Sequence, residues 1–309
     1  MLRARASHLL LVLLVAACSG DGATGPTSDP PPGPDTGSPF PLDRGDDGAA
    51  TPGTYKGLWL RLTDNGAPNV TAVDGVVGLV CVGMSNANQE CTAFIAAVRG
   101  AWAGEVSTQV RVANCAVGGR AVEAWMDPAQ DAVLWDDCVA RKLPAAGIRA
   151  DQARVIWHKA ADMNTTGPGG SRLPVYPDPA SDYFTFQRNL TAFAARVKAK
   201  LPSVQAVYSS SRSYGGFAGS FARGEPLSYE EGHALNAWLA DHASVDGVWY
   251  GWGAYLWAPA CDTGFTNGSG VCYERADYVD DGVHPSDAGR AKIARLVHER
   301  FRREAWYRR

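Results

Sequence analysis

The strongest constraint on the fold is an alternation, along residues 75–300, of short apolar runs with segments whose apolar residues recur at helical spacing. Five β-branched runs have the length and composition of buried strands. They lie at 75–83, 108–114, 153–159, 204–211 and 245–252. Helical patterns separate them, at about 88–99, 131–143, 182–201 and 229–242, and a last helix follows Pro285. This alternation predicts an α/β fold, a three-layer α/β/α sandwich around a central parallel sheet of about five strands.

Residues that directly follow the strands are candidates for a functional site. In open parallel sheets, ligands bind outside the carboxyl ends of the strands, so these residues share one edge. They are Ser85, residues 114–119, Lys159, residues 212–216 and the aromatic run 249–257.

The N-terminus has the pattern of an export signal. Arg3 and Arg5 precede the apolar run "LLLVLLVAAC", which is too short to span a bilayer as a permanent helix. Its end, "VAAC", resembles the bacterial lipobox, in which cleavage leaves a Cys that is then lipidated. We therefore expect residues 1–18 to be a lipoprotein-type signal peptide and Cys18 to be lipidated and to anchor an exported protein to the bacterial cell envelope. An ordinary secretory signal, cut nearby, is the alternative.

Residues 19–53 are rich in Gly, Pro, Asp and Ser and nearly free of large apolar side chains. Such a segment cannot bury enough surface to offset its ordering entropy, which predicts a disordered tether. Residues 54–309 then form one domain. The full chain has a net charge of −3 and no basic stripe interleaved with aromatics, so it is not expected to bind nucleic acid, nor a membrane except through its anchor.

Of the seven cysteines, all but Cys18 fall in the domain. An even number in an exported chain favours disulfides over metal, and no C-x-x-C or His-rich spacing indicates a metal site. Cys261 and Cys272 bracket a Gly-rich loop and are the predicted pair. The remaining four, Cys81, Cys91, Cys115 and Cys138, allow three pairings that the sequence does not rank.

The stretch "DDGVHPSDAG" at 280–289 combines a helix start with an acid and a histidine. Pro285 and Ser286 are typical of the first positions of a helix. His284, with Asp281 three residues before it, indicates an imidazole oriented by its own carboxylate, although Asp280 is a possible substitute. The other domain histidines lack such an acid: His158 adjoins the sheet edge, and His233, His242 and His298 are expected on helix surfaces.

Ser85, in "GMSNANQE", stands at the turn from the first strand to a helix. Its Oγ is expected at the sheet edge and its backbone N–H at a helix N-terminus, where developing negative charge is favoured. Ser85 as nucleophile, His284 as base and Asp281 as the orienting acid form a candidate catalytic set. This is not the α/β-hydrolase elbow G-x-S-x-G, because position 87 is Ala and the acid and base share one loop.

The pairing of this Ser with Asp-x-x-His resembles the SGNH (GDSL-like) hydrolases. "GMSNA" is most similar to the "GQSN" form of the sialate O-acetylesterase and acetylxylan esterase branch, and "NCAVGGRAVEAW" resembles that branch's stretch of Asn and Gly-Gly ending in Glu-Ala-Trp. The resemblance spans residues 75–300. It implies an SGNH, flavodoxin-like fold, no cofactor, and an oxyanion hole that uses the backbone N–H groups of Ser85 and Gly119.

A third block departs from this resemblance. The branch carries Trp-x-Gln-Gly-Glu-x-Asp, whose Gln donates to the oxyanion, whereas this chain has "WHKAAD". Trp157 and Asp162 match, but Lys159 stands in place of the Gln. Lys159 is either an oxyanion donor or a structural cation paired with Asp162 or another carboxylate.

Five residues near the sheet edge are expected to bind substrate: Asn86, Arg212, Tyr214, Trp252 and Tyr255. Exposed aromatic rings would suit stacking on sugar faces, with core packing as the alternative, and Arg212 would hold a substrate carboxylate or pair with an acid at the edge. The sequence thus predicts a cell-envelope serine esterase that removes acetyl or similar acyl groups from carbohydrate. The alternatives are a general lipid or polyester esterase and a non-catalytic glycan-binding surface lipoprotein.

Overall fold

The computed structural model describes residues 62–159, 161–264, 266–267 and 270–309. The predicted signal peptide, Cys18 and the tether lie outside the described residues. Among the described helices, none combines the length and apolar character that a membrane span needs.

A six-stranded mixed sheet forms the middle layer, in the order β2-β1-β3-β4-β6-β5. Its five parallel strands are β1 (Val77–Gly83), β2 (Val110–Asn114), β3 (Ala153–Lys159), β4 (Ala206–Ser210) and β6 (Val248–Trp252). The predicted parallel sheet is therefore confirmed. The short strand β5 (Ser244–Val245) adds an antiparallel edge beside β6.

The last predicted strand, 245–252, is in fact a hairpin. Asp246 (φ 51°) and Gly247 (φ 75°) join β5 to β6 through a two-residue turn. A positive φ at both positions is typical of the type I′ hairpin turn, for which Asp-Gly is a favoured pair.

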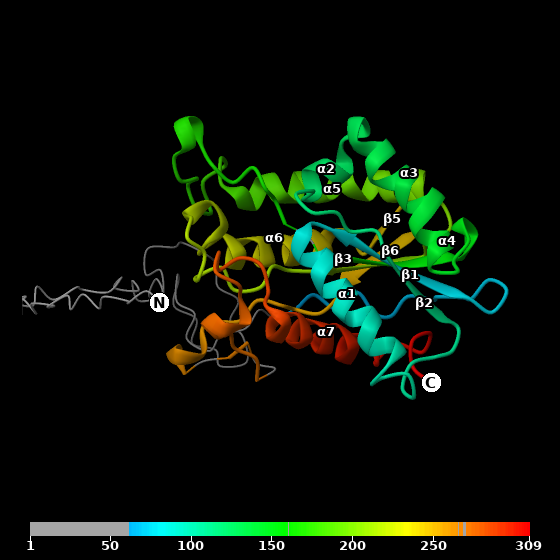
Figure 1. Ribbon diagram of the computed structural model, residues 1–309. Coiled ribbons are helices and arrows are strands. Elements are labelled where there is room, and N and C mark those ends of the chain that lie inside the picture. The colour runs from blue at the N-terminus through cyan, green and yellow to red at the C-terminus, as the bar shows by residue number, and fades with distance from the viewer. Residues whose placement is uncertain (1–61, 160, 265, 268–269) are drawn as a thin grey trace, which may run out of the picture. The chain divides into compact units, whose positions relative to one another are not determined.

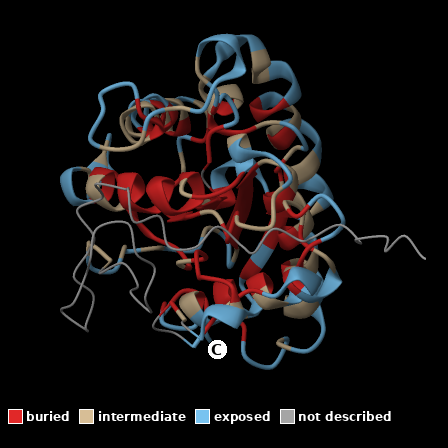
Figure 2. Ribbon diagram, turned by 90° about the vertical axis from the view of Figure 1, so that its left-hand side faces the viewer, coloured by how far each residue is buried: buried red, intermediate tan, exposed pale blue. Residues whose placement is uncertain are grey.

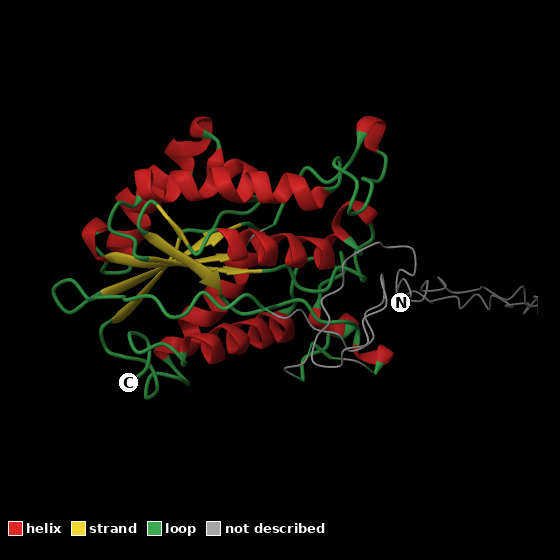
Figure 3. Ribbon diagram, turned by 180° about the vertical axis from the view of Figure 1, so that it is seen from behind, coloured by secondary structure: helices red, strands yellow, loops and turns green. Residues whose placement is uncertain are grey.

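Helices cover both faces of the sheet (Figures 1 and 3). The helices α1 (Ser85–Arg99) and α7 (Asp287–Phe301) pack against one face. On the other face lie α5 (Asp182–Lys200) and α6 (Leu227–Asp241), together with the short helices α2 (Val122–Met126), α3 (Trp135–Asp137) and α4 (Leu143–Ala145). The three-layer α/β/α architecture agrees with the prediction.

Alternate side chains of the central strands divide between two apolar cores. Leu79 and Cys81 of β1 join the core under α1 and α7, whereas Val80 and Val82 join the core under α5 and α6. Figure 2 shows the strands and the inward helix faces buried between exposed outer surfaces. A strand buried on both faces reads as a continuous apolar run, which is why β1 could be predicted.

The predicted helix at 131–143 is present but irregular: residues 135–145 are continuously helical with a π-helical turn in the middle, and a 3₁₀ segment precedes them. A 3₁₀ segment (Pro128–Val133), α3, a π-helical turn (Cys138–Lys142) and α4 follow one another. Pro144 lies within this continuous run and lacks the N–H that a regular α-helix needs, directly after the π-helical turn.

Three disulfides join the six cysteines of the domain. Cys261–Cys272 is the predicted pair and is confirmed. Cys81–Cys91 links β1 to α1, and Cys115–Cys138 links the segment after β2 to the π-helical turn. The structure thus selects one of the three pairings that the sequence left open.

Two histidines that were expected on helix surfaces are buried instead. His233 lies in the first half of α6, where every residue from Leu227 to Leu235 is buried, and burial lowers its pKa to about 3. His298 of α7 stacks on Trp102 with ring centroids 4.2 Å apart, and its Nδ1 contacts the Tyr307 hydroxyl at 2.8 Å. The C-terminal residues fold back over this part of α7, so the helical pattern alone could not place His298.

Candidate active site

The predicted site residues meet at the carboxyl edge of the sheet. Ser85 begins α1 directly after β1, Gly119 follows β2, Lys159 ends β3 and Arg212 follows β4. Since β2 and β3 flank β1 on opposite sides, the chain reverses its winding direction at β1. A crevice opens at such a switch point in parallel sheets, and Ser85 stands in it.

Ser85, His284 and Asp281 form a continuous chain of hydrogen bonds. The Ser85 Oγ lies 2.8 Å from His284 Nε2, and His284 Nδ1 lies 2.5 Å from Asp281 Oδ2. Because a carboxylate can only accept, Nδ1 carries the proton and Nε2 is free to accept from the serine hydroxyl. Asp280, the possible substitute, is exposed, and its backbone carbonyl accepts from Arg275.

The Asp281 carboxylate is held by its own loop. Its Oδ1 accepts the backbone N–H groups of Val283 and His284, each at 2.9 Å. Desolvation opposes ionisation here, but the hydrogen bonds from the His284 ring and these N–H groups prevail and lower the pKa of Asp281 to about 2. Asp281 is therefore charged at neutral pH and fixes the imidazole tautomer.

Gly282 allows this loop to lie close to its neighbour. Its φ is +65°, and a Cβ at this position would lie 1.7 Å from the backbone oxygen of Phe217. Only glycine satisfies both the left-handed conformation and the close approach. The backbone at Phe217 therefore packs directly against the loop that carries Asp281 and His284.

Two backbone N–H groups are suitably placed to receive negative charge. Ser85 is the first residue of α1, and its helix has no side-chain N-cap. Gly119 has φ +69°, and its N–H donates no hydrogen bond to a described residue. A Cβ on the adjacent Gly118 would lie 3.9 Å from the Ser85 Cβ, which places this turn beside the nucleophile.

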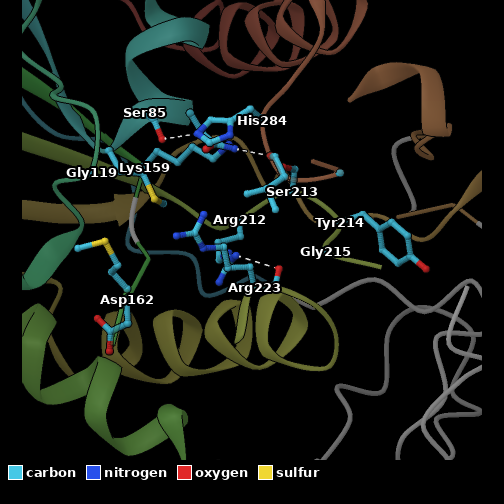
Figure 4. A pocket seen from close by; sticks show the side chains of 15 residues that line it. Ser85, Gly119, Lys159, Asp162, Arg212, Ser213, Tyr214, Gly215, Arg223 and His284 are labelled. Atoms are coloured by element: carbon cyan, nitrogen blue, oxygen red, sulfur yellow. Dashed lines mark hydrogen bonds between the residues drawn. The ribbon is translucent and has the colours of Figure 1, made fainter. Parts of the chain in front are cut away.

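Lys159 pairs with a carboxylate that the sequence analysis did not single out. Its Nζ lies 2.5 Å from Glu90 Oε1 of α1, and the two side chains are 1% and 0% exposed. Burial lowers the pKa of Lys159 and raises that of Glu90, and their mutual attraction opposes both shifts. Lys159 lines the pocket beside Ser85 and Gly119 (Figure 4), but its bond to Glu90 favours the structural alternative.

Three asparagines tie the surrounding loops to α1. The amide of Asn86, predicted to bind substrate, instead donates to the Val283 carbonyl at 2.9 Å, although Asn86 also lines the pocket. Asn88 donates to the Ala116 carbonyl, and Asn114 donates to the carbonyl of Asn88. These bonds hold the loop of Gly119 and the loop of His284 against the helix that begins at Ser85.

A pocket of about 220 Å³ opens at these residues. Arg212, predicted to bind substrate, is one of the residues that line it (Figure 4). The lining residues are Met84, Ser85, Asn86, Gly119, Lys159, Asp162, Met163, Arg212, Ser213, Tyr214, Gly215, Arg223, Gly282, Val283 and His284.

The three aromatic residues predicted to bind substrate do not present their rings to this pocket. The Tyr214 ring points away from it and packs on Phe217 (Figure 4). Trp252 is 4% exposed, its indole N–H donates to Asn236, and its ring packs edge-on against Tyr255. Neither Trp252 nor Tyr255 lines the pocket, because both rings belong to or pack against the core under α5 and α6.

Fold and site together define a three-layer α/β/α protein with a hydrogen-bonded Ser, His and Asp at the carboxyl edge of its sheet. No protein-family model matches the sequence, and no curated protein matches it significantly.

Similar solved structures include GDSL-like lipases and acetylxylan esterases. A GDSL-like lipase from Bacteroides thetaiotaomicron is 12% identical, with a TM-score of 0.42 and coverage of 77% of this chain and 93% of that chain. A lipase/acylhydrolase from Enterococcus faecalis is 14% identical, with a TM-score of 0.43 over 74% and 96%. A catalytic mutant of an acetylxylan esterase from Geobacillus stearothermophilus is 14% identical, with a TM-score of 0.44 over 75% and 96%. A function for this chain has to be inferred from its own side chains.

Proposed function

We propose that this protein is a serine esterase that hydrolyses a small acyl ester, with Ser85 as nucleophile, His284 as general base and Asp281 as the orienting acid. The observation that carries the proposal is the unbroken chain from Ser85 Oγ through the imidazole to the Asp281 carboxylate, with distances of 2.8 and 2.5 Å. A serine hydroxyl is a weak nucleophile until an adjacent base can take its proton.

In the proposed reaction, His284 Nε2 takes the Ser85 proton as Oγ attacks the ester carbonyl carbon. The tetrahedral intermediate then collapses, and the imidazolium returns this proton to the leaving alcohol, which leaves an acyl group on Ser85. A water, activated by the same nitrogen, attacks the acyl-enzyme and releases the acid. Asp281 stays ionised throughout and offsets the imidazolium charge.

The negative charge of the tetrahedral intermediate would be received by the N–H groups of Ser85 and Gly119. The first belongs to the N-terminus of α1, where the helix dipole favours an anion. Each donor of this kind contributes about 10²- to 10³-fold in rate.

A pocket of about 220 Å³ suits an acetyl or other short acyl group rather than a long lipid chain. Carbohydrate as the alcohol remains part of the proposal, but it has less support than the sequence suggested. The rings of Trp252 and Tyr255 are packed in or against the core, so they offer no stacking surface at this pocket.

We also propose that Cys18 anchors the protein to the bacterial cell envelope, on the strength of the lipobox-like sequence. Cys18→Ser should release the protein from the membrane fraction or leave it uncleaved. The anchor is ruled out if the variant and the wild type fractionate alike and neither carries the mass of a lipid.

The catalytic proposal is tested with a panel of esters that varies acyl length, together with acetylated xylo-oligosaccharides. We expect turnover of the acetyl esters by the wild type and a loss of about 10⁴-fold or more in kcat for Ser85→Ala. Binding of acetylated glycans without turnover of any ester would favour the non-catalytic alternative. Preference for long acyl chains would favour a lipid or polyester esterase.

A further inference from the structure

The Arg212 guanidinium lies at the proposed active-site pocket, and one of its nitrogens has no hydrogen-bond partner among the described residues. Its side chain is 11% exposed and lines the same pocket as Ser85 and His284. Its Nη1 is buried and has no hydrogen-bond partner among the described residues. A buried guanidinium nitrogen without a protein partner is costly, so this nitrogen favours an acceptor from outside the chain.

The other two nitrogens fix the orientation of this group. Nη2 donates to the Arg223 carbonyl at 3.1 Å, and Nε lies 3.5 Å from Glu231 Oε2 of α6. These two contacts hold the guanidinium in place at the wall of the pocket that Ser85 and His284 also line (Figure 4). A donor that is already oriented binds an acceptor at a lower entropic cost.

The carboxyl groups near Arg212 do not fully neutralise it. Burial holds the pKa of Glu231 well above its usual range, against the attraction of Arg212. Burial, reinforced by neighbouring carboxyls, raises the pKa of Asp162 to about 8, and burial raises that of Asp182 to about 7. Glu231 and Asp162 therefore favour their neutral forms near pH 7, while Asp182 is about half ionised, so these carboxyls do not cancel the charge of Arg212.

The two other cations of the pocket differ from Arg212. Lys159 already forms an ion pair with Glu90. Arg223 is exposed, so solvent and salt screen its charge. Arg212 is the cation that combines burial, an open hydrogen-bonding position and a place in the pocket of the nucleophile.

We propose that Arg212 binds a carboxylate carried by the substrate itself, so that the preferred esters are anionic. The proposal rests on the esterase function above and names its substrate class. In a pocket of about 220 Å³, the carboxylate must lie within a few bonds of the reacting carbonyl. It belongs either to the acyl group, as in a dicarboxylic half-ester, or to the alcohol, as in an acylated acid sugar.

Two matched pairs of esters distinguish these sources. The acyl pair is 4-nitrophenyl hydrogen succinate and its neutral methyl ester, and the alcohol pair is 4-acetoxybenzoate and methyl 4-acetoxybenzoate. For each pair, kcat/KM is measured for the wild type, Arg212→Gln and Arg295→Gln. Arg295 is an exposed residue of α7 and controls for the loss of one positive charge.

We expect the anionic-to-neutral ratio of kcat/KM, in one of the two pairs, to fall about 10- to 100-fold in Arg212→Gln and to stay unchanged in Arg295→Gln. The ratio cancels the intrinsic reactivity of each ester and any general loss of activity. Because Arg212 is buried, the wild-type preference should persist at 0.5 M NaCl. An unchanged ratio in both pairs, or a preference that disappears with salt, overturns the proposal while leaving the esterase function intact.

A binding measurement separates this proposal from the esterase function. Titration calorimetry of Ser85→Ala with glucuronate, succinate and their neutral methyl esters should show binding of at least one carboxylate, weakened about 10-fold or more by Arg212→Gln in the same background. Such binding with no esterase activity would retain the anion site and reject the esterase. Equal affinity for the charged and neutral ligands would reject the anion site, whatever the activity.

Discussion

The adjacent acids of the 280–284 loop differ in their contacts, and this difference predicts different losses of activity. Asp281→Asn should lower kcat/KM by about 10⁴-fold, because an amide can stabilise the wrong imidazole tautomer and cannot offset the imidazolium charge. Asp280→Asn should change it less than about 3-fold, since the Asp280 backbone rather than its side chain is bonded. Steady-state kinetics and thermal midpoints of both variants check this. The reverse order of losses would assign the acid to Asp280.

The buried Lys159–Glu90 pair predicts a stability effect that two matched variants can separate from catalysis. Lys159→Met leaves a buried carboxyl without its partner and should cost about 3–5 kcal/mol, measured by urea unfolding. The double variant Lys159→Met/Glu90→Leu should recover most of this stability. If the refolded double variant has a kcat about 10²–10³-fold below the wild type, Lys159 is an oxyanion donor rather than a structural cation.

For single residues, contacts set by local spacing could be predicted from the sequence, whereas burial could not. The Asp-x-x-His spacing places Asp281 and His284 on one turn, so their contact could be predicted without knowing the fold. The burial of Trp252 and the pairing of Lys159 with Glu90 depend on which helix covers which strand. No local pattern encodes those contacts.

At the scale of the loops that join the elements, two glycines with similar φ values predict different outcomes. Gly282→Ala adds a Cβ 1.7 Å from the Phe217 oxygen, so the loop must shift and kcat/KM should fall at least about 10²-fold. Gly247→Ala, in the β5–β6 turn, meets no atom within 4 Å and should cost only about 1 kcal/mol of conformational strain. Kinetics and unfolding of the pair test the claim, which fails if Gly282→Ala keeps wild-type activity.

Element types were predictable where one hydrophobic period dominates. The strands β1 and β3 and the helices α5 and α7 follow their patterns closely, and Ser286 caps α7 as expected through the Gly289 N–H. The Asp246–Gly247 pair is a typical hairpin turn sequence, but it lies within an otherwise apolar run that was read as one strand. The π-helical turn at Cys138–Lys142 directly precedes Pro144, whose missing N–H the helical pattern of apolar residues does not register.

On the scale of the whole molecule, the buried carboxyls predict a pH-dependent stability. The folded pKa of Asp162, about 8, exceeds the ordinary value of 3.8, so the folded state retains a proton that the unfolded state releases. This contribution is fully present below pH 3.8 and is lost as pH rises towards 8, with a slope of about 1.4 kcal/mol per pH unit at most.

Urea unfolding of the wild type and Asp162→Asn at pH 5.5 and 8.5 checks this linkage. The decline in the free energy of unfolding between the two pH values should be smaller in the variant. The buried, neutral His158 and His233 act in the opposite direction as pH falls, but equally in both proteins, so their effect cancels. An equal decline in both proteins would contradict the raised pKa of Asp162.

The architecture of the molecule was predictable because alternating strands and helices allow few arrangements. The pairing of four cysteines and the contacts of Arg212 in the pocket could not be predicted, because both arise between segments distant in sequence. Cys115 and Cys138 are 23 residues apart, and Arg212 meets Glu231 of a different element.

The central claim is that His284 activates Ser85 for attack on a carbonyl. The most direct measurement is covalent labelling with a fluorophosphonate, followed by peptide mass spectrometry of the wild type, Ser85→Ala and His284→Ala. We expect one phosphonyl group on Ser85 in the wild type, none at this position in Ser85→Ala, and labelling slowed by about 10⁴-fold in His284→Ala. Labelling of another residue, or equal labelling rates with and without His284, would contradict it.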